Sequence, residues 1–406
     1  MATDPKKKAQ TKAKSQAKKQ VKKAAKKNPG VVIALVALVI VVVVVAVVLY
    51  LKVPAVHDAV ENIISRQSST NNGANNNTNQ GGNSNLVLGE GELKVHFIDV
   101  GQGDCIYIQF PDGKDMLIDC GNEDKSKMPD SLAANLNSRI TDGKLDYLML
   151  THADKDHVSY MDEVLDMFVV SKIFMPNIKA NNSGLEKDIN DLDPEKLAMF
   201  TDDDKISTEV YAKFFIAALS EEGCQIVLNV DADNAHNSIV ISDGTTYNLT
   251  FYCMTAATWT EKHLNTAEWK NAVSPIGILE YNGKRIVLTG DSNERNEPDF
   301  VSRVGSIDCD VLKVGHHGSQ TSSTASFLAA ITCEYAVFCC GTGNDYDHPR
   351  QAAIDRMSSY TALYRTDLNG NIVLTIDANG ELSFAMDNEN VTQEQERIGA
   401  DTAKAA

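Results

Sequence analysis

The sequence lacks any Cys-x-x-Cys pair, although it contains eight cysteines. Paired cysteines at that spacing are what a structural zinc knuckle needs, so we expect none. Cys105, Cys120, Cys253, Cys339 and Cys340 lie in or beside apolar, strand-like runs, where cysteine behaves as a small core residue. The cysteines therefore predict buried thiols rather than a disulfide framework.

Positive charge is scarce beyond residue 30. Residues 1–30 hold eleven Lys and one Asp, a net charge of +10, whereas the whole chain carries −17, so the remainder carries −27. Such an acidic remainder favours solubility and weighs against adhesion to nucleic acid, which needs a basic footprint. The N-terminal lysines could themselves bind anionic lipid or nucleic acid, but a role in membrane orientation explains them sufficiently.

An uninterrupted apolar run, VVIALVALVIVVVVVAVVLYL, occupies residues 31–51 directly after the basic tail. At about 1.5 Å per residue the run is roughly 30 Å long, which matches one hydrocarbon core. A cleaved secretory leader has a similar layout, but this run is longer than a leader's apolar region and no small-residue cleavage site closes it. We predict a single-pass transmembrane helix over residues 31–52, with the basic tail in the cytoplasm and the rest extracellular.

Charge is also missing from residues 67–85, which have almost no apolar side chains either. Such a segment cannot bury enough surface to fold, so it predicts a flexible linker. We therefore expect a juxtamembrane segment and linker over 53–92, a folded domain over 93–388, and a polar C-terminal tail over 389–406.

The folded part alternates short β-type runs with helical spacing. Residues 93–110 hold two such runs joined by a Gly-rich turn, and residues 115–121 form a third that ends at Asp119. After a fourth run at 145–151, the apolar spacing predicts a helix that begins at His157. Strands and helices then recur to about residue 385, which indicates mixed α/β layering with polar clusters at the strand ends.

Three of these strand ends carry side chains that are costly to desolvate without a partner. They are His152, Asp154, Asp156 and His157 in THADKDH, Asp291 in TGD, and His316 and His317 in GHHGS. Histidine mixed with carboxylate favours Zn²⁺, Mn²⁺ or iron, whereas carboxylates alone would favour Mg²⁺ or Ca²⁺. Each cluster alone has a structural interpretation; Asp156, for example, could cap the helix that follows it. Their coincidence at three strand ends predicts a metal site.

Seven segments between Lys94 and Phe384 resemble the metallo-β-lactamase fold, and within it the C-terminal hydrolase domain of the ComEC-type competence proteins. The segments are FIDVGQGD, LIDCGN, LTHADKDH, LTGD, DVLKVGHHGSQTSS, GTGNDYDHPR and RTDLNG. The resemblance implies an α/β fold built as an αββα sandwich, with two divalent metal ions, Zn or Mn, held between the two sheets.

The resemblance also implies which residues hold the metals. The implied ligands are His152, Asp154, Asp156, His157, Asp291 and His316, and the additional candidates are Asp119, His317 and Ser319. Asp291 would bridge the two metals and would orient the attacking hydroxide or take its proton. Asp156 would also be catalytic, and His348 would contact substrate phosphate or a metal.

Two of the departures from the family pattern concern metal ligands. The third histidine motif has no clear match, because His236 and His263 are the only histidines between His157 and His316. Asp154 stands where most of the superfamily has histidine, as is usual in the competence-like branch. The three-histidine zinc site that is typical of β-lactam hydrolysis is therefore absent, which disfavours that activity.

These observations lead to the hypothesis of a membrane-anchored, extracytoplasmic, metal-dependent hydrolase that cleaves phosphodiester bonds. One alternative is a ComEC-like nuclease in DNA uptake or processing, although the acidic composition fits DNA poorly. Another is a binding or sensing module whose missing motif has removed catalysis. The expected partners are the membrane and a phosphodiester substrate, with DNA as one candidate, and no protein partner is inferable.

Overall fold

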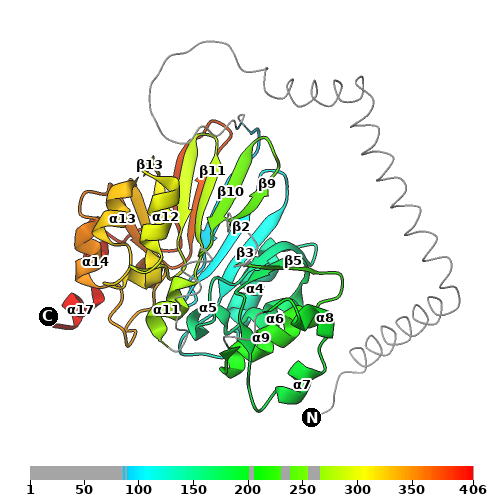
Figure 1. Ribbon diagram of the computed structural model, residues 1–406. Coiled ribbons are helices and arrows are strands. Elements are labelled where there is room, and N and C mark those ends of the chain that lie inside the picture. Colours follow the sequence, from blue (N-terminus) through cyan, green and yellow to red (C-terminus); the bar gives the residue numbers. More distant parts are fainter. Residues whose placement is uncertain (1–85, 87–88, 201–204, 230–237, 255–265, 406) are drawn as a thin grey trace, which may run out of the picture. The chain divides into compact units, whose positions relative to one another are not determined.

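The computed structural model of the chain contains two large β-sheets with helices on both sides (Figure 1). The structure describes residues 86, 89–200, 205–229, 238–254 and 266–405. This mixed-sheet arrangement confirms the predicted α/β fold class. The predicted transmembrane helix and linker lie outside the described residues. In the part of the chain that is described, no helix is both long and apolar enough to cross a membrane.

The larger sheet has eight strands in the order β19, β18, β1, β2, β3, β4, β5 and β8. Their bounds, in chain order, are β1 (Leu93–Phe97), β2 (Cys105–Gln109), β3 (Asp115–Cys120), β4 (Lys144–Met149), β5 (Val169–Met175), β8 (Gln225–Leu228), β18 (Ile372–Ile376) and β19 (Leu382–Met386). Strands β3, β4, β5 and β8 pair in parallel. Their carboxyl ends therefore lie at one edge of the sheet, where ligand sites form in α/β proteins.

The smaller main sheet has seven strands in the order β17, β16, β14, β12, β11, β10 and β9. Their bounds are β9 (Ser238–Ser242), β10 (Tyr247–Tyr252), β11 (Ile276–Tyr281), β12 (Lys284–Leu288), β14 (Val311–Lys313), β16 (Tyr335–Phe338) and β17 (Ala362–Arg365). Strands β12, β14, β16 and β17 are parallel to one another. Two short pairs accompany the main sheets, β6 (Lys179–Ala180) with β7 (Lys205–Ile206) and β13 (Ile307–Asp308) with β15 (Ile331–Thr332).

Both faces of each main sheet are buried, because successive side chains of a strand point to opposite faces and pack on each. In β2, Ile106 and Ile108 pack between the sheets, whereas Tyr107 packs under the helices of the larger sheet. In β12, Ile286 faces the space between the sheets and Val287 faces the helices of the smaller sheet. Period-two alternation with both faces apolar is what a central strand of a layered α/β domain requires.

Helices cover the outer face of each sheet (Figure 1). The helices that pack on the larger sheet are α4 (Asp130–Arg139), α6 (Met161–Met167) and α9 (Glu209–Ser220), and those on the smaller sheet are α12 (Glu297–Val304), α13 (Ala325–Ala330) and α14 (Gln351–Arg356). The other described helices are α5 (Lys155–Val158), α7 (Glu186–Asn190), α8 (Pro194–Leu197), α11 (Ala267–Ala272), α15 (Thr366–Asn369), α16 (Gln393–Glu396), α17 (Ala400–Ala405) and the 3₁₀ turn η1 (Gly315–Gly318).

The helix predicted to begin at His157 is in fact two helices. Helix α5 begins two residues earlier, and α6 follows after a break at residues 159–160. The Tyr160 N–H donates to Cys120 O at 2.9 Å, so the chain is held against the end of β3 instead of continuing the helix. Asp156 therefore lies inside α5, and the helix-capping role considered for it is wrong.

The segment expected as a polar C-terminal tail carries α16 and α17 and contacts the loop that holds His348. The Ala400 N–H donates to Pro349 O at 2.8 Å, and the Gln351 N–H donates to Asp401 Oδ1 at 2.9 Å. The end of the described chain is thus attached beside a residue that the sequence predicted to contact substrate.

All eight cysteines are free thiols, and six of them are buried. Because a buried thiol is shielded from oxidants and exchange partners, we expect mass mapping of the full-length protein to find mostly free cysteines. Cys105 and Cys120 are opposite each other in the β2–β3 ladder and are the first pair to examine. Three or more native disulfides would contradict this expectation.

Candidate metal centre

Strand ends from both main sheets bring the predicted metal ligands together. Asp156 and His157 follow β4 in helix α5, Asp291 follows β12, and His317 lies in η1 after β14. One ligand atom from each of these four residues lies within 4.8 Å of the other three. We call this set the four-residue cluster. Donors so close together, from three separate segments of the chain, are the arrangement that a metal site requires.

Asp291 occupies the middle of this arrangement, and its side chain is 2% exposed. Its Oδ1 lies 3.1 Å from His157 Nε2 and 3.6 Å from His317 Nε2. Its Oδ2 lies 3.7 Å from His152 Nε2 and 3.6 Å from His316 Nε2. One carboxylate thus separates two pairs of histidines, and its bridging role stays a prediction.

Hydrogen bonds behind the cluster fix two of its rings. His157 Nδ1 lies 2.7 Å from Asp119 Oδ2, and Asp119 itself accepts from the Thr151 N–H and hydroxyl at 2.7 Å each. His317 Nδ1 lies 2.7 Å from Cys339 O, which can only accept. Each ring therefore donates from Nδ1 and directs Nε2 into the cluster, as outer-shell partners of metal-bound histidine do.

The structure places His317, rather than the predicted His316, beside Asp156. His317 Nε2 lies 3.0 Å from Asp156 Oδ2, whereas His316 faces the other oxygen of Asp291. Both histidines have a left-handed backbone, with φ of 53° and 51° respectively, a conformation that costs about 1–3 kcal/mol per non-glycine residue and concentrates at functional sites. Sequence alone could not assign two adjacent histidines to opposite sides of one carboxylate.

Asp154 lies outside the four-residue cluster, although it was predicted as a ligand. Its Oδ1 accepts from Lys270 Nζ in α11 at 2.5 Å. Near α11, Ser274 Oγ lies 3.2 Å from both His152 Nδ1 and the Asp291 backbone nitrogen. Neither Lys270 nor Ser274 was identified from the sequence, because EWKNAVS resembles an ordinary helix end. His236 and His263 lie outside the described residues.

His348, which was predicted to contact substrate, and Ser319, an additional ligand candidate, lie near the histidines but outside the cluster. The His348 ring is buried, with its centroid 5.3 Å from that of His316, and its Nδ1 has no hydrogen-bond partner among the described residues. Ser319 Oγ lies 3.1 Å from Thr321 Oγ1. Burial, followed by the nearby His316, lowers the pKa of His348 to about 3, so its ring is neutral at physiological pH.

A buried ion pair lies beside the His317 ring, on the side of its Nδ1 atom. Lys313 Nζ lies 2.8 Å from Asp104 Oδ2, with side-chain exposures of 0% and 1%, and Asp104 Oδ1 lies 3.3 Å from His317 Nδ1. Burial alone would raise the pKa of Asp104, but Lys313 and then His317 lower it to about 2. The sequence did contain a signal, because a lysine inside the apolar run DVLKV needs a buried partner.

The cluster has the donor chemistry of a cation site. Burial lowers the pKa of His152 to about 3 and leaves its Nε2 without a hydrogen bond among the described residues. Asp291 Oδ1 is likewise buried and without a hydrogen bond there. Burial opposes charge on His157, but Asp291, Asp119 and Asp156 raise its pKa well above the usual value, so buried carboxylates dominate the local field. Imidazole and carboxylate donors with this negative excess fit a divalent transition metal.

Glycines of two family-like segments let the metal-binding loop approach the strands. A Cβ on Gly121 would lie 2.5 Å from backbone atoms of Asp156 and His157, and a Cβ on Gly103 would lie 2.5 Å from Asp156 O. Such distances are too short for any side chain. The glycines in GQGD and DCGN therefore have a packing reason that the sequence analysis did not assign.

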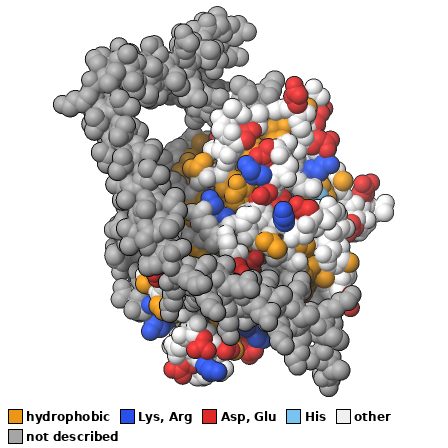
Figure 2. All heavy atoms as spheres, turned by 90° about the vertical axis from the view of Figure 1, so that its right-hand side faces the viewer, with side chains coloured by type: hydrophobic (Ala, Val, Ile, Leu, Met, Phe, Trp, Pro, Cys, Tyr) orange, Lys and Arg blue, Asp and Glu red, His pale blue; other side chains and the backbone are white. Residues whose placement is uncertain are grey.

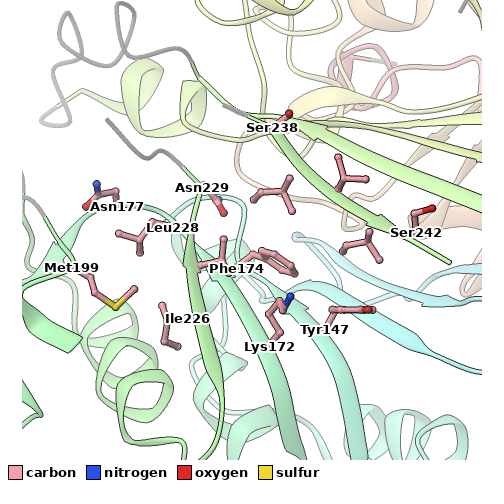
Figure 3. Close-up of a pocket in the computed structure, with 14 residues that line it drawn as sticks. Tyr147, Lys172, Phe174, Asn177, Met199, Ile226, Leu228, Asn229, Ser238 and Ser242 are labelled. Carbon is pink, nitrogen blue, oxygen red and sulfur yellow. The ribbon is translucent and has the colours of Figure 1, made fainter. Parts of the chain in front are cut away.

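A separate groove of about 630 Å³ opens between the edge strands β8 and β9 (Figure 3). Phe174 and Lys172 project into it from the larger sheet, and Ser238 and Ser242 border it on β9. None of the predicted site residues is among the described residues that line this groove. This groove therefore does not locate the candidate metal centre, which is identified instead by its clustered ligand atoms.

Comparison with known proteins places these segments in a family context. The family model described as the metallo-beta-lactamase superfamily matches residues 98–212 and 270–342. ComE operon protein 3 of Bacillus subtilis (strain 168) is 25% identical over 295 residues, which cover 69% of this chain and 33% of that protein. Competence protein ComA of Neisseria gonorrhoeae is 38% identical over 100 residues, covering 24% of this chain and 14% of that protein. The crystal structure of the metallo-beta-lactamase fold protein YhfI from Bacillus subtilis aligns with a TM-score of 0.38 at 13% identity, over 72% of this chain and 100% of that one.

Proposed function

Because the model of the metallo-beta-lactamase superfamily matches residues 98–212 and 270–342, we propose that this chain is a membrane-anchored, metal-dependent phosphodiesterase whose hydrolase domain faces the outside of the cell. The observation that carries the proposal is the buried Asp291 carboxylate, with Asp156, His157 and His317 donor atoms within 4.8 Å. Metal-dependent hydrolysis is the chemistry that such a site supports best.

A zinc or manganese ion held by the four-residue cluster would polarise a phosphoryl oxygen and make water a nucleophile at neutral pH. The chain's own residues prepare that chemistry. Asp119 and Cys339 O fix the rings of His157 and His317 through Nδ1, so that Nε2 of each ring faces the cluster. Burial alone would raise the pKa of Asp291, but His157 and His317 hold it well below the usual range. Asp291 is thus an ionised carboxylate that can orient water.

His348 has a different proposed role, which is to contact the substrate. Its neutral, buried ring lies beside His316 and outside the four-residue cluster. Tyr346, which is 44% exposed, stacks against it at a centroid distance of 5.7 Å and marks the solvent side of this loop. A substrate phosphate that reached the cluster past Tyr346 would meet the His348 ring on its way.

The surface charge favours a phosphodiester other than DNA. On the described part of the face in Figure 2, lysine and arginine side chains are interspersed with aspartate and glutamate and form no continuous basic patch. The net charge of −27 beyond residue 30 agrees with this view, since nucleic-acid sites show clustered basic residues. The name competence protein, borne by one relative, is the observation that keeps a DNA substrate as the second candidate.

An assay on purified full-length protein tests the proposed function. We expect hydrolysis of bis-p-nitrophenyl phosphate in the presence of Zn²⁺ or Mn²⁺, slower cleavage of single- and double-stranded DNA, and none of a β-lactam. Faster cleavage of DNA would favour the nuclease. Binding of phosphodiesters without cleavage of any would favour the binding or sensing module and contradict the proposal.

The proposed orientation makes its own prediction about topology. Protease added to intact cells should release the hydrolase domain by cutting within residues 66–90, because the basic tail retains the N-terminus in the cytoplasm. Immunoblotting of the medium and the cell fraction measures the release. Protection in intact cells with cleavage only after lysis would reverse the orientation, and a mature protein that starts after residue 53 would favour a cleaved leader.

A further inference from the structure

We propose that the Lys270 ammonium group takes the place of a second metal ion, so that the centre binds one divalent cation rather than the two expected from the sequence. The inference rests on the proposed function, because it concerns the same metal centre. It assigns a role to a residue that the family-like segments do not contain.

Lys270 neutralises a carboxylate that would otherwise be a ligand. Its Nζ lies 2.5 Å from Asp154 Oδ1, and the two side chains are 29% and 24% exposed. Both are thus largely withdrawn from solvent at the mouth of the centre. A lysine ammonium is a compact point charge that can neutralise the negative charge of a carboxylate, as a bound metal ion would.

Asn271, the next residue of α11, hydrogen-bonds the remaining ligand atoms on the Asp154 side of the centre. With the Asn271 amide oriented to suit its neighbours, its nitrogen donates to Asp154 Oδ2 at 3.1 Å, and its oxygen accepts from His316 Nε2 at 3.2 Å. Both oxygens of Asp154 and the inward nitrogen of His316 are therefore engaged by Lys270 and Asn271.

The donors left on the two sides of Asp291 differ in number. Around Oδ1, each residue of the four-residue cluster offers one ligand atom within 4.8 Å of the others, which is enough to hold one divalent cation. Of the two histidine Nε2 atoms that lie 3.6–3.7 Å from Oδ2, those of His152 and His316, only that of His152 remains without a hydrogen bond. One imidazole and one carboxylate oxygen are too few for a structural or catalytic zinc site. The geometry therefore supports one cation on the Oδ1 side and a lysine in place of the other.

Metal counting on the full-length protein in detergent tests this inference. The protein is stripped with a chelator, reloaded with excess Zn²⁺, freed of unbound metal by gel filtration, and analysed for zinc per chain. We expect about one zinc for the wild type and for Lys270→Arg, which keeps the charge. Lys270→Ala frees Asp154 and should bring the count toward two. Lys213→Ala, which removes a lysine paired on the surface with Glu209 at 2.8 Å, is the matched control and should keep one.

Each outcome of the count has a meaning. Two zinc ions in the wild type, or one in a folded Lys270→Ala variant, would overturn the role of Lys270 while leaving a metal-dependent hydrolase intact. No zinc in the wild type would instead contradict the proposed metal centre. Electron paramagnetic resonance of the Mn²⁺-loaded wild type gives an answer even where the alanine variant does not fold, because one ion gives an uncoupled manganese signal and two bridged ions give an exchange-coupled one.

Discussion

Replacing Asp291 by Asn should leave the fold intact while metal content falls and phosphodiester hydrolysis drops by several orders of magnitude. Asn keeps the shape of the side chain but removes the negative charge that faces four histidines at 3.1–3.7 Å. Because the other ligand atoms lie around that carboxylate, the loss of its charge should both weaken metal binding and reduce stabilisation of the transition state. Zinc analysis, circular dichroism and turnover of bis-p-nitrophenyl phosphate measure the three quantities.

His348→Ala is the control for that experiment. His348 is outside the four-residue cluster, so the variant should keep its metal, and its loss should show mainly in the handling of substrate, seen as a raised KM. If Asn at position 291 retained full metal and a near wild-type rate on every phosphodiester that the parent cleaves, the assignment of Asp291 would be wrong.

Lys313→Met should lower the free energy of unfolding by about 3–5 kcal/mol, the range found when one partner of a buried ion pair is removed. Lys313 and Asp104 are at most 1% exposed, and their charged atoms lie 2.8 Å apart. Methionine fills a similar volume, so the main change is an uncompensated carboxylate behind His317. Denaturant titration of wild type and variant under identical conditions measures the difference.

A second lysine gives the comparison for this variant. Lys284 Nζ also lies 2.8 Å from a carboxylate, that of Asp310, but the two side chains are 32% and 19% exposed. Solvent screening reduces such a pair to about 0–1 kcal/mol, so Lys284→Met should have little effect. The double variant Asp104→Asn, Lys313→Met should be less destabilised than the sum of its parts. A Lys313→Met effect as small as that of Lys284→Met would show that burial does not govern the pair.

The sequence predicted the parts of the fold and site that depend on local pattern. Apolar runs that end in histidine and aspartate identified β4, β12 and β14 as strands and placed His152, Asp156, His157 and Asp291 at their ends. The alternation of strand-like runs with helical spacing predicted mixed α/β layering, because helices cover the faces of a mostly parallel sheet. Parallel strands share an edge within each sheet, but the convergence of the β4 end with the ends of β12 and β14 depends on how the two sheets pack on each other.

The parts that were missed depend on contacts between distant segments. Lys270 is 116 residues from Asp154, and a lysine on a short helix looks like a solvated one until its partner is known. The order of His316 and His317 about Asp291 is set by two left-handed backbone angles, which no spacing reveals. The break between α5 and α6 arises from the hydrogen bond of Tyr160 to Cys120, again between segments that the sequence does not connect.

The most direct test of metal-dependent phosphodiester hydrolysis is turnover of bis-p-nitrophenyl phosphate by the same full-length preparation before chelation, after chelation, and after stepwise return of Zn²⁺ or Mn²⁺. The account predicts that activity disappears with the metal and returns in proportion to the metal bound by the four-residue cluster, with Asp291→Asn failing to recover at any metal concentration. Activity that survives complete removal of metal, or that never appears although the cluster is loaded, would contradict it.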